Sequence, residues 1–225
     1  MSRGGRLSTQ GPRVSGYCAI SWRSAFRCLT NSTPTRGPLR GCRRLPVKTD
    51  PRLPRRLLAA APPARSTLFL CTTGEEQGLV GARAFVAQRD RLPGPLVAAL
   101  NIDGTSIQPF RTLDARGGSQ SSLGTLAEEA GRRAGIGVRH ESLGVGGSDH
   151  APFLLAGIPP IWIGAALPDD WMRTRYHTPQ DDMAQPIDFG AVAAYTQFVS
   201  TLARLIANAP TRPAWREGEF FGCLR

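Results

Sequence analysis

The chain has 225 residues and a formal net charge of +11, a balance that is typical of proteins that bind nucleic acid. The charge is uneven: residues 1–57 hold 13 of the 28 Lys and Arg residues and one of the 17 acidic residues, whereas residues 58–225 carry a net charge of −1. A hydrophobic content of 41% and the lack of any apolar run near about 18 residues exclude a membrane-embedded protein. The chain therefore divides into a basic leader and a nearly neutral body long enough for one domain.

The leader, residues 1–57, is rich in Arg, Gly, Pro and Ser, and its short apolar stretches keep neither a helical nor a strand period. This composition predicts disorder. An Arg-rich, acid-poor start also resembles an organelle transit peptide, and a basic arm could bind nucleic acid through phosphate contacts. No secretory signal follows the first arginines, and the five cysteines contain no C-x-x-C pair that would indicate a zinc site.

The body alternates strand-like apolar runs with segments of helical periodicity. Strands are predicted over residues 66–73, 96–102, 137–143 and 160–164. Helices are predicted over residues 78–90, 121–135 and 187–207, a long loop over 165–179 and a loose tail over 209–225. Alternation of this kind predicts an α/β sheet covered by helices on both faces.

Polar side chains that could carry chemistry follow several of these strands. Glu75 and Glu76 come after the first predicted strand, Asp103 ends the second, and His177 lies in the long loop. Ligand sites in open α/β sheets lie at the carboxyl ends of the strands, so these residues are expected to converge. Carboxylates and an imidazole are ligands for a metal such as zinc, and a carboxylate off the metal could take a proton from water.

Each of these residues also has a purely structural interpretation. A glutamate pair before a helix complements the helix dipole, and an aspartate before a glycine, as at Asp103, is common in turns. His177 could belong to an ordinary loop, and Ser148 or Asp149 could cap a helix. Spacing alone leaves both interpretations open.

Four motifs, in a fixed order, favour the chemical interpretation. They are GEEQGLVGARAF at 74–85, LNIDG at 100–104, GGSDHAPFLLAGIPPI at 146–161 and YHTPQDD at 176–182. Together they resemble the co-catalytic zinc exopeptidase family, which includes bacterial leucyl aminopeptidases, glutamate carboxypeptidase and glutaminyl cyclase. The resemblance covers residues 58–208 and implies a catalytic domain with a three-layer α/β/α fold around a mixed, mostly parallel sheet.

The resemblance also implies a role for several residues. Glu75 matches the general base that deprotonates a zinc-activated water and passes the proton to the leaving amine. Glu76 and His177 match ligands of one zinc ion, and Asp103 matches a ligand of the other. Tyr176 matches a tyrosine whose hydroxyl stabilises the tetrahedral oxyanion.

A second group is expected around the substrate. Asp149 and His150 match an acidic position close to the metal ligands, although a helix cap accounts for Asp149 equally well. Trp171, with Trp162 and Met172, is expected to line the substrate pocket, and core packing is the alternative for Trp162.

Two further zinc ligands of the family, a histidine in an H-x-D strand end and a bridging aspartate, are expected upstream of Glu75. The first histidine of this chain is His140, and the only acid before Glu75 is Asp50, which lacks the family's surrounding sequence. We therefore expect an incomplete ligand set for two zinc ions, weak zinc binding and a sheet without its N-terminal strands. Because the chain has 27 Arg and one Lys, as in a GC-rich gene, we interpret residues 1–57 as a frameshifted or mis-assigned replacement of the upstream third.

The sequence thus predicts a zinc-dependent exopeptidase of the aminopeptidase type that acts on peptides. A glutaminyl cyclase-like acyltransferase with one zinc is an alternative on the same scaffold. Binding of nucleic acid by residues 1–57 is a third, disfavoured because the body has no basic excess and the leader has few aromatic residues. Relatives are often exported, but no signal peptide is visible; substrate preference and oligomeric state are left open.

Overall fold

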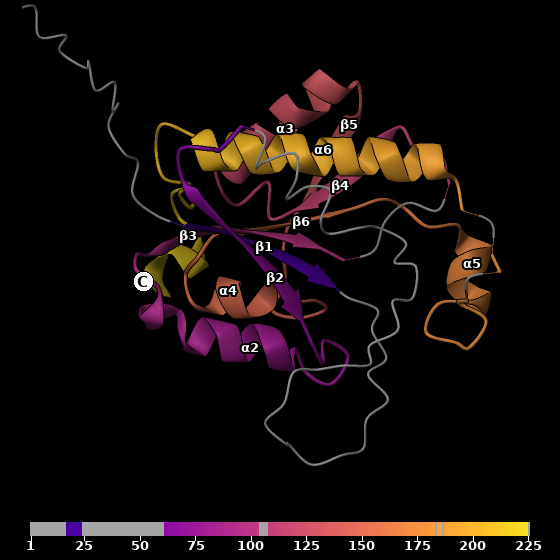
Figure 1. Cartoon of the computed structure of the whole chain (residues 1–225), viewed down its shortest axis with the longest axis horizontal. Helices are drawn as coiled ribbons and strands as arrows, with labels where there is room; N and C mark the ends of the chain where they lie inside the picture. The colour runs from indigo at the N-terminus through magenta and orange to yellow at the C-terminus, as the bar shows by residue number, and fades with distance from the viewer. Residues whose placement is uncertain (1–16, 24–60, 104–107, 183, 186, 225) are drawn as a thin grey trace, which may run out of the picture.

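A computed structural model describes residues 17–23, 61–103, 108–182, 184–185 and 187–224 of the chain. It contains a six-stranded sheet between two layers of helices (Figure 1). The strands are β1 (Tyr17–Arg23), β2 (Ser66–Thr72), β3 (Leu96–Ile102), β4 (Thr112–Arg116), β5 (Gly137–Glu141) and β6 (Pro160–Gly164). The helices are α2 (Val80–Ala87), α3 (Leu123–Ala134), α4 (Ala151–Leu155), α5 (Asp169–Thr174) and α6 (Phe189–Asn208), with 3₁₀ turns η1 (Arg89–Arg91) and η2 (Phe220–Leu224).

The sheet is mixed and mostly parallel, with strand order β2-β1-β3-β6-β4-β5. β2, β1, β3 and β6 pair in parallel, β4 runs antiparallel to β6, and β5 pairs in parallel with β4. Helices α3 and α6 cover one face and α2 and α4 the other (Figure 1). This confirms the predicted three-layer α/β/α architecture.

The larger part of the core lies between the sheet and α6. Buried side chains recur along α6 with helical spacing: Tyr195, Phe198, Val199, Leu202 and Ile206. The Tyr195 hydroxyl donates a hydrogen bond of 2.7 Å to the carbonyl of Ile163, and burial raises the pKa of this phenol well above its usual value. The long helix is therefore fixed to β6 by a polar contact as well as by apolar packing.

The opposite face packs against α2 and α4 through a smaller apolar cluster. Phe153 of α4 is fully buried, with Phe85 of α2 at a ring-centroid distance of 6.1 Å. The sheet residues beneath them, Ala19 and Ala99, are 1% exposed and belong to the same cluster. Small side chains on the strands let these short helices approach the sheet closely.

Strand β1 corrects the expectation for the leader. Residues 17–23 pair in parallel with β2 on one side and with β3 on the other, so that β1 lies inside the sheet. Ala19 and Ile20 are 1% and 2% exposed, on opposite faces of the sheet. The expectation that residues 1–57 are disordered and outside the domain is therefore wrong for residues 17–23; the rest of the leader lies outside the described residues.

Three further segments differ from expectation. β4 was not predicted, and α5 lies within the stretch expected to be a loop over 165–179. The tail is not loose, because the Trp215 indole donates to the carbonyl of Gly157 at 2.8 Å and Trp215 forms an isolated bridge with Ser121. No helix in the described ranges is long and apolar enough to cross a membrane.

Arg65 joins the tail to the end of α6. Its side chain is 1% exposed, and its guanidinium donates to the carbonyls of Ile206 and Ala209 at 3.2 and 2.6 Å and of Thr211 at 2.9 Å. A cation at this position satisfies the last carbonyls of a helix and complements the negative end of its dipole. The apolar strand β2 is thereby connected at its start to the end of the longest helix.

Candidate active site

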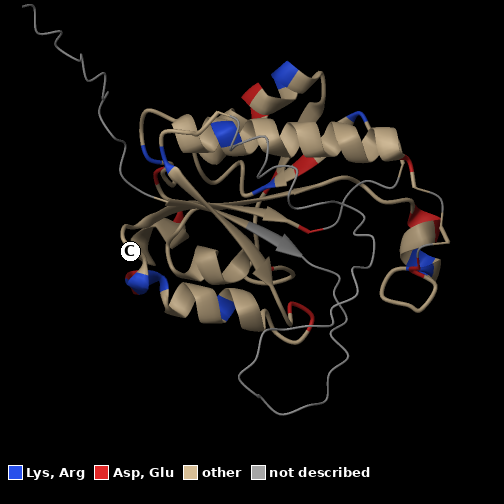
Figure 2. Cartoon of the chain, in the orientation of Figure 1, with Lys and Arg blue, Asp and Glu red and all other residues tan. Residues whose placement is uncertain are grey.

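The turn between β2 and α2 presents the first two candidate residues, Glu75 and Glu76. Backbone bonds from Gly78 and Leu79 to the Glu75 carbonyl, at 3.1 and 2.9 Å, close this turn. Gly74 adopts φ 64°, the left-handed region that favours glycine. The result is a tight acidic turn at the carboxyl end of β2, visible in Figure 2.

The structure brings Glu76 and His177 together. His177 Nε2 lies 2.9 Å from Glu76 Oε1, although the residues are far apart in sequence, and the two side chains are 50% and 42% exposed. His177 adopts φ 59°, which is uncommon for a residue with a Cβ. The N···O separation is near the roughly 3.3 Å between two ligands of a tetrahedral zinc ion.

Asp103, at the end of β3, is oriented by two neighbours. Ser148 Oγ donates to Asp103 Oδ2 at 2.6 Å, and Asn101 Nδ2 donates to Ser148 Oγ at 2.8 Å. Because the amide can only donate to the hydroxyl, the single hydroxyl proton of Ser148 points to the Asp103 carboxylate. A helix cap at Ser148 or Asp149 was the structural alternative for this motif; in the structure, the Ser148 hydroxyl orients one candidate metal ligand.

Asp149 and His150 are buried, at 1% and 5% exposure. The Thr72 hydroxyl, at the end of β2, donates to Asp149 Oδ2, which joins the loop before α4 to the strand that leads into the acidic turn. The N-cap residue of α4 is His150, whose side chain makes no cap hydrogen bond, and the role of Asp149 stays a prediction. Burial lowers the pKa of His150, whose Nε2 lies 3.3 Å from the carbonyl of Gly144. Burial therefore favours the neutral form of this imidazole.

Tyr176 and Trp171 stand beside the candidate histidine. The Tyr176 ring stacks on His177 with centroids 3.8 Å apart, and Trp171 lies 6.0 Å from Tyr176. The Trp171 indole donates to Gln185 Oε1, and Gln185 Nε2 donates to Asp181 Oδ1 at 2.5 Å. Gln185 is 5% exposed and was not predicted, because nothing in a sequence marks a glutamine whose amide is buried against an indole.

The candidate metal ligands are of the types that bind zinc, but few of them lie close together. Glu76 and His177 supply the oxygen and nitrogen donors that zinc prefers, in a turn and a loop that meet at the sheet edge. Asp103 follows β3 at the same edge, with its carboxylate held by Ser148. Within the described ranges, no group of three or more His, Cys, Asp or Glu side chains is arranged to hold a metal ion. The roles of the individual residues stay predictions.

Comparisons with known proteins agree with this architecture. The chain resembles LapA aminopeptidase of Legionella pneumophila, with a TM-score of 0.65, 19% identity and coverage of 88% of this chain and 53% of LapA. An aminopeptidase from Aneurinibacillus sp. strain AM-1 gives a TM-score of 0.65, 17% identity and coverage of 87% and 45%. BSAP, a zinc aminopeptidase from Bacillus subtilis, gives a TM-score of 0.62, 18% identity and coverage of 88% and 48%.

These likenesses concern the fold, and the chain spans about half the length of each of these structures. A comparison with curated proteins finds no match. The model of peptidase family M28, in contrast, matches residues 54–203, more than half of the chain. This match begins close to residue 58, where the sequence motifs begin to resemble zinc exopeptidases. The chain belongs to peptidase family M28.

Proposed function

We propose that this chain is a zinc-dependent exopeptidase of the aminopeptidase type, which hydrolyses peptide bonds at the carboxyl edge of its sheet. The observation that carries the proposal is the contact of 2.9 Å between His177 Nε2 and Glu76 Oε1, next to Glu75 and Tyr176. Membership of family M28 and the fold of zinc aminopeptidases support it.

Glu76 and His177 would hold the zinc ion. Bound zinc supplies a Lewis acid for the scissile carbonyl and lowers the pKa of water. Glu75, half-buried in the same turn, would take a proton from the attacking water and pass it to the leaving amine. The Tyr176 hydroxyl donates to the developing oxyanion, and stacking on His177 limits the positions its ring can take.

Asp103 completes the acidic edge of the site. Its carboxylate is held by Ser148, itself 3% exposed and held by Asn101, so it keeps one orientation without a metal ion. Burial lowers the pKa of His150, which disfavours a positive charge that would compete with a cation there. A pre-oriented carboxylate suits a second zinc ion or the free amino group of a substrate.

Hydrolysis of leucine p-nitroanilide by the full chain with added zinc tests the proposal. Glu75→Gln should abolish hydrolysis and leave zinc content unchanged, because it removes the base and not a ligand. His177→Gln should lower zinc content. His140→Gln is its matched control, because His140 Nε2 lies 2.9 Å from Glu128 Oε1 in a similar pair outside the site.

Other outcomes point to other functions. Conversion of N-terminal glutamine without release of an amino acid would indicate a glutaminyl cyclase-like acyltransferase. Salt-dependent binding of nucleic acid that is lost on removal of residues 1–57 would indicate a role for the basic leader. Basic and acidic residues are interspersed over the described elements, so the body offers little support for that function (Figure 2).

A further inference from the structure

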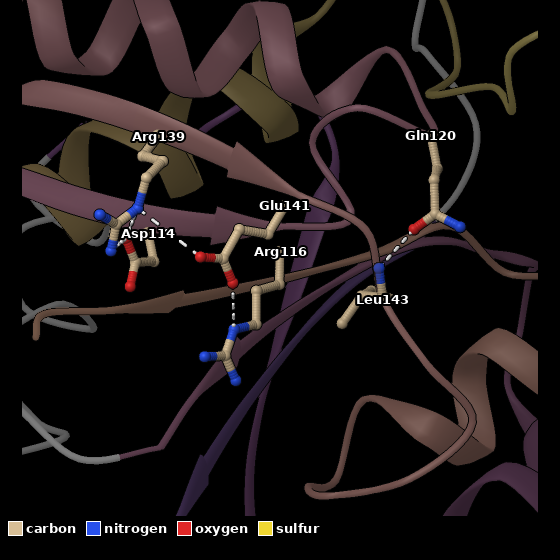
Figure 3. A network of polar contacts seen from close by, with 6 residues as sticks. All are labelled: Asp114, Arg116, Gln120, Arg139, Glu141 and Leu143. Carbon is tan, nitrogen blue, oxygen red and sulfur yellow. Dashed lines mark hydrogen bonds and ion pairs between the residues drawn. The ribbon is translucent and has the colours of Figure 1, made fainter.

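A network of charged side chains lies on β4 and β5, at the edge of the sheet opposite β2 (Figure 3). Arg139 Nη2 lies 2.7 Å from Asp114 Oδ1, and Arg116 Nε donates to Glu141 Oε2 at 2.9 Å. Arg139 Nε also lies 3.6 Å from Glu141 Oε1. The two cations and two anions cancel, so any ligand here would be held by directed hydrogen bonds rather than by an excess of charge.

The guanidinium of Arg116 is fixed from two sides. Glu141 accepts from Nε, and the guanidinium carbon lies 4.5 Å from the ring centroid of Trp162. Among the described residues, no hydrogen bond from Nη1 or Nη2 of Arg116 is present, and its side chain is 47% exposed. A guanidinium with this edge open presents two parallel N–H donors, the geometry that a carboxylate accepts.

The ring beneath Arg116 extends toward the site edge. A Cβ on Gly164 would lie 2.0 Å from Trp162 Cη2, so the indole lies flat over the glycine at the carboxyl end of β6. Ile163 pairs with Ile102, which places Gly164 beside Asp103 on the neighbouring strand. With strands about 4.8 Å apart, the guanidinium over this ring lies roughly 5–10 Å from Asp103.

The pKa of a neighbouring histidine agrees with the placement of Arg116 close to Asp103. Arg116 and Asp103 both shift the pKa of the buried His150, Arg116 downward and Asp103 upward, although burial is the largest cause. One imidazole therefore lies within reach of both charges. The pairing of Asn101 with Trp162, and of Trp162 with Arg116, puts all three side chains in one row on the same face of the sheet.

We propose that Arg116 binds the free α-carboxylate of a short peptide, so that the chain prefers dipeptides and tripeptides with an unmodified carboxyl terminus. The proposal rests on the proposed exopeptidase function. Successive Cα atoms are about 3.8 Å apart, so the terminal carboxylate of a dipeptide or tripeptide falls roughly 5–10 Å from the scissile carbonyl. That is the separation between the acidic edge at Asp103 and the guanidinium of Arg116.

The test compares a dipeptide with its carboxyl-terminal amide, using the full chain with zinc. The expected kcat/KM is about tenfold or more higher for the free acid, as for a charge-assisted hydrogen bond. Arg116→Gln should remove this preference, Arg116→Lys should reduce it, and neither should change hydrolysis of leucine p-nitroanilide, which has no carboxylate. Arg139→Gln removes the same charge from the same network and should keep the preference.

A binding measurement separates this proposal from the proposed function. A reduced-bond dipeptide and its amide are titrated against tryptophan fluorescence, which needs no turnover. If nitroanilide is not cleaved but the acid binds about tenfold tighter than the amide in an Arg116-dependent way, the exopeptidase proposal fails and the Arg116 site stands. Equal binding of acid and amide, or an equal loss of the preference in Arg116→Gln and Arg139→Gln, would overturn the Arg116 site.

Discussion

Replacement of Ile20 tests whether β1 is an integral strand of the sheet. Ile20 is 2% exposed, and its neighbours in register are Phe69 of β2 and Leu100 of β3. Truncation of a buried isoleucine to alanine costs about 2–5 kcal/mol, since it loses buried area and leaves a cavity. Because β1 has a strand on each side, the backbone around Ile20 can move little to fill the cavity. We therefore expect Ile20→Ala to lower the free energy of unfolding by about 3–4 kcal/mol.

Urea unfolding followed by circular dichroism measures this change, with an unchanged m-value as evidence that the denatured state is the same. Ile20→Val should cost about 0.5–1.5 kcal/mol, because only one methylene group is lost. Val145→Ala is the exposed control, since Val145 is 63% exposed, and it should change stability by less than about 0.5 kcal/mol. An effect of Ile20→Ala as small as that of Val145→Ala would show that residues 17–23 do not belong to the core.

Three further predictions concern hydrogen bonds and burial elsewhere in the structure. Ser148→Ala removes the donor that orients Asp103, and we expect a loss of about 10- to 100-fold in kcat or zinc affinity, measured by nitroanilide hydrolysis and metal titration, with melting little changed. Arg65→Met leaves three carbonyls without their charged donor and should cost about 3–5 kcal/mol by urea unfolding, whereas the half-buried Arg204→Met, which loses one bond to a single carbonyl, should cost under about 1 kcal/mol. Burial holds the pKa of His150 below its ordinary value of 6.5, so the unfolded chain binds more protons and stability should fall as pH drops below about 6.5, with a flatter profile in His150→Gln.

The strands and helices with a strong apolar pattern were predictable from the sequence. β3 and β6 have the predicted bounds, and α3 and α6 lie within or close to theirs. β4 escaped prediction, because only Leu113 and Ala115 of its five residues are apolar and the Asp114 between them is also buried. Such a short strand is specified by its neighbours rather than by its own sequence.

β1 was missed for a different reason. Its seven residues lie in a segment whose composition predicts disorder, and their place in the sheet depends on pairing with strands that come more than 40 residues later. Because its partner strands are so distant in the sequence, β1 has no local hydrophobic periodicity from which it could be predicted. The same holds for the pair formed by Glu76 and His177, which the motifs of the family suggested and spacing alone did not.

The boundary in charge near residue 57 is therefore not the boundary of the fold. β1 separates β2 from β3, the two strands that lead to the acidic turn and to Asp103. With neighbouring strands about 4.8 Å apart, β1 holds these two chain ends roughly 10 Å from each other. Direct pairing of β2 with β3 would halve that separation and crowd Glu76 against Asp103. If the proposed site held two metal ions about 3.5–4 Å apart, each with ligands from one side, it would need this wider spacing. A strand from the basic leader thus sets the width of the candidate site, even though it lies outside the segment that matches the family.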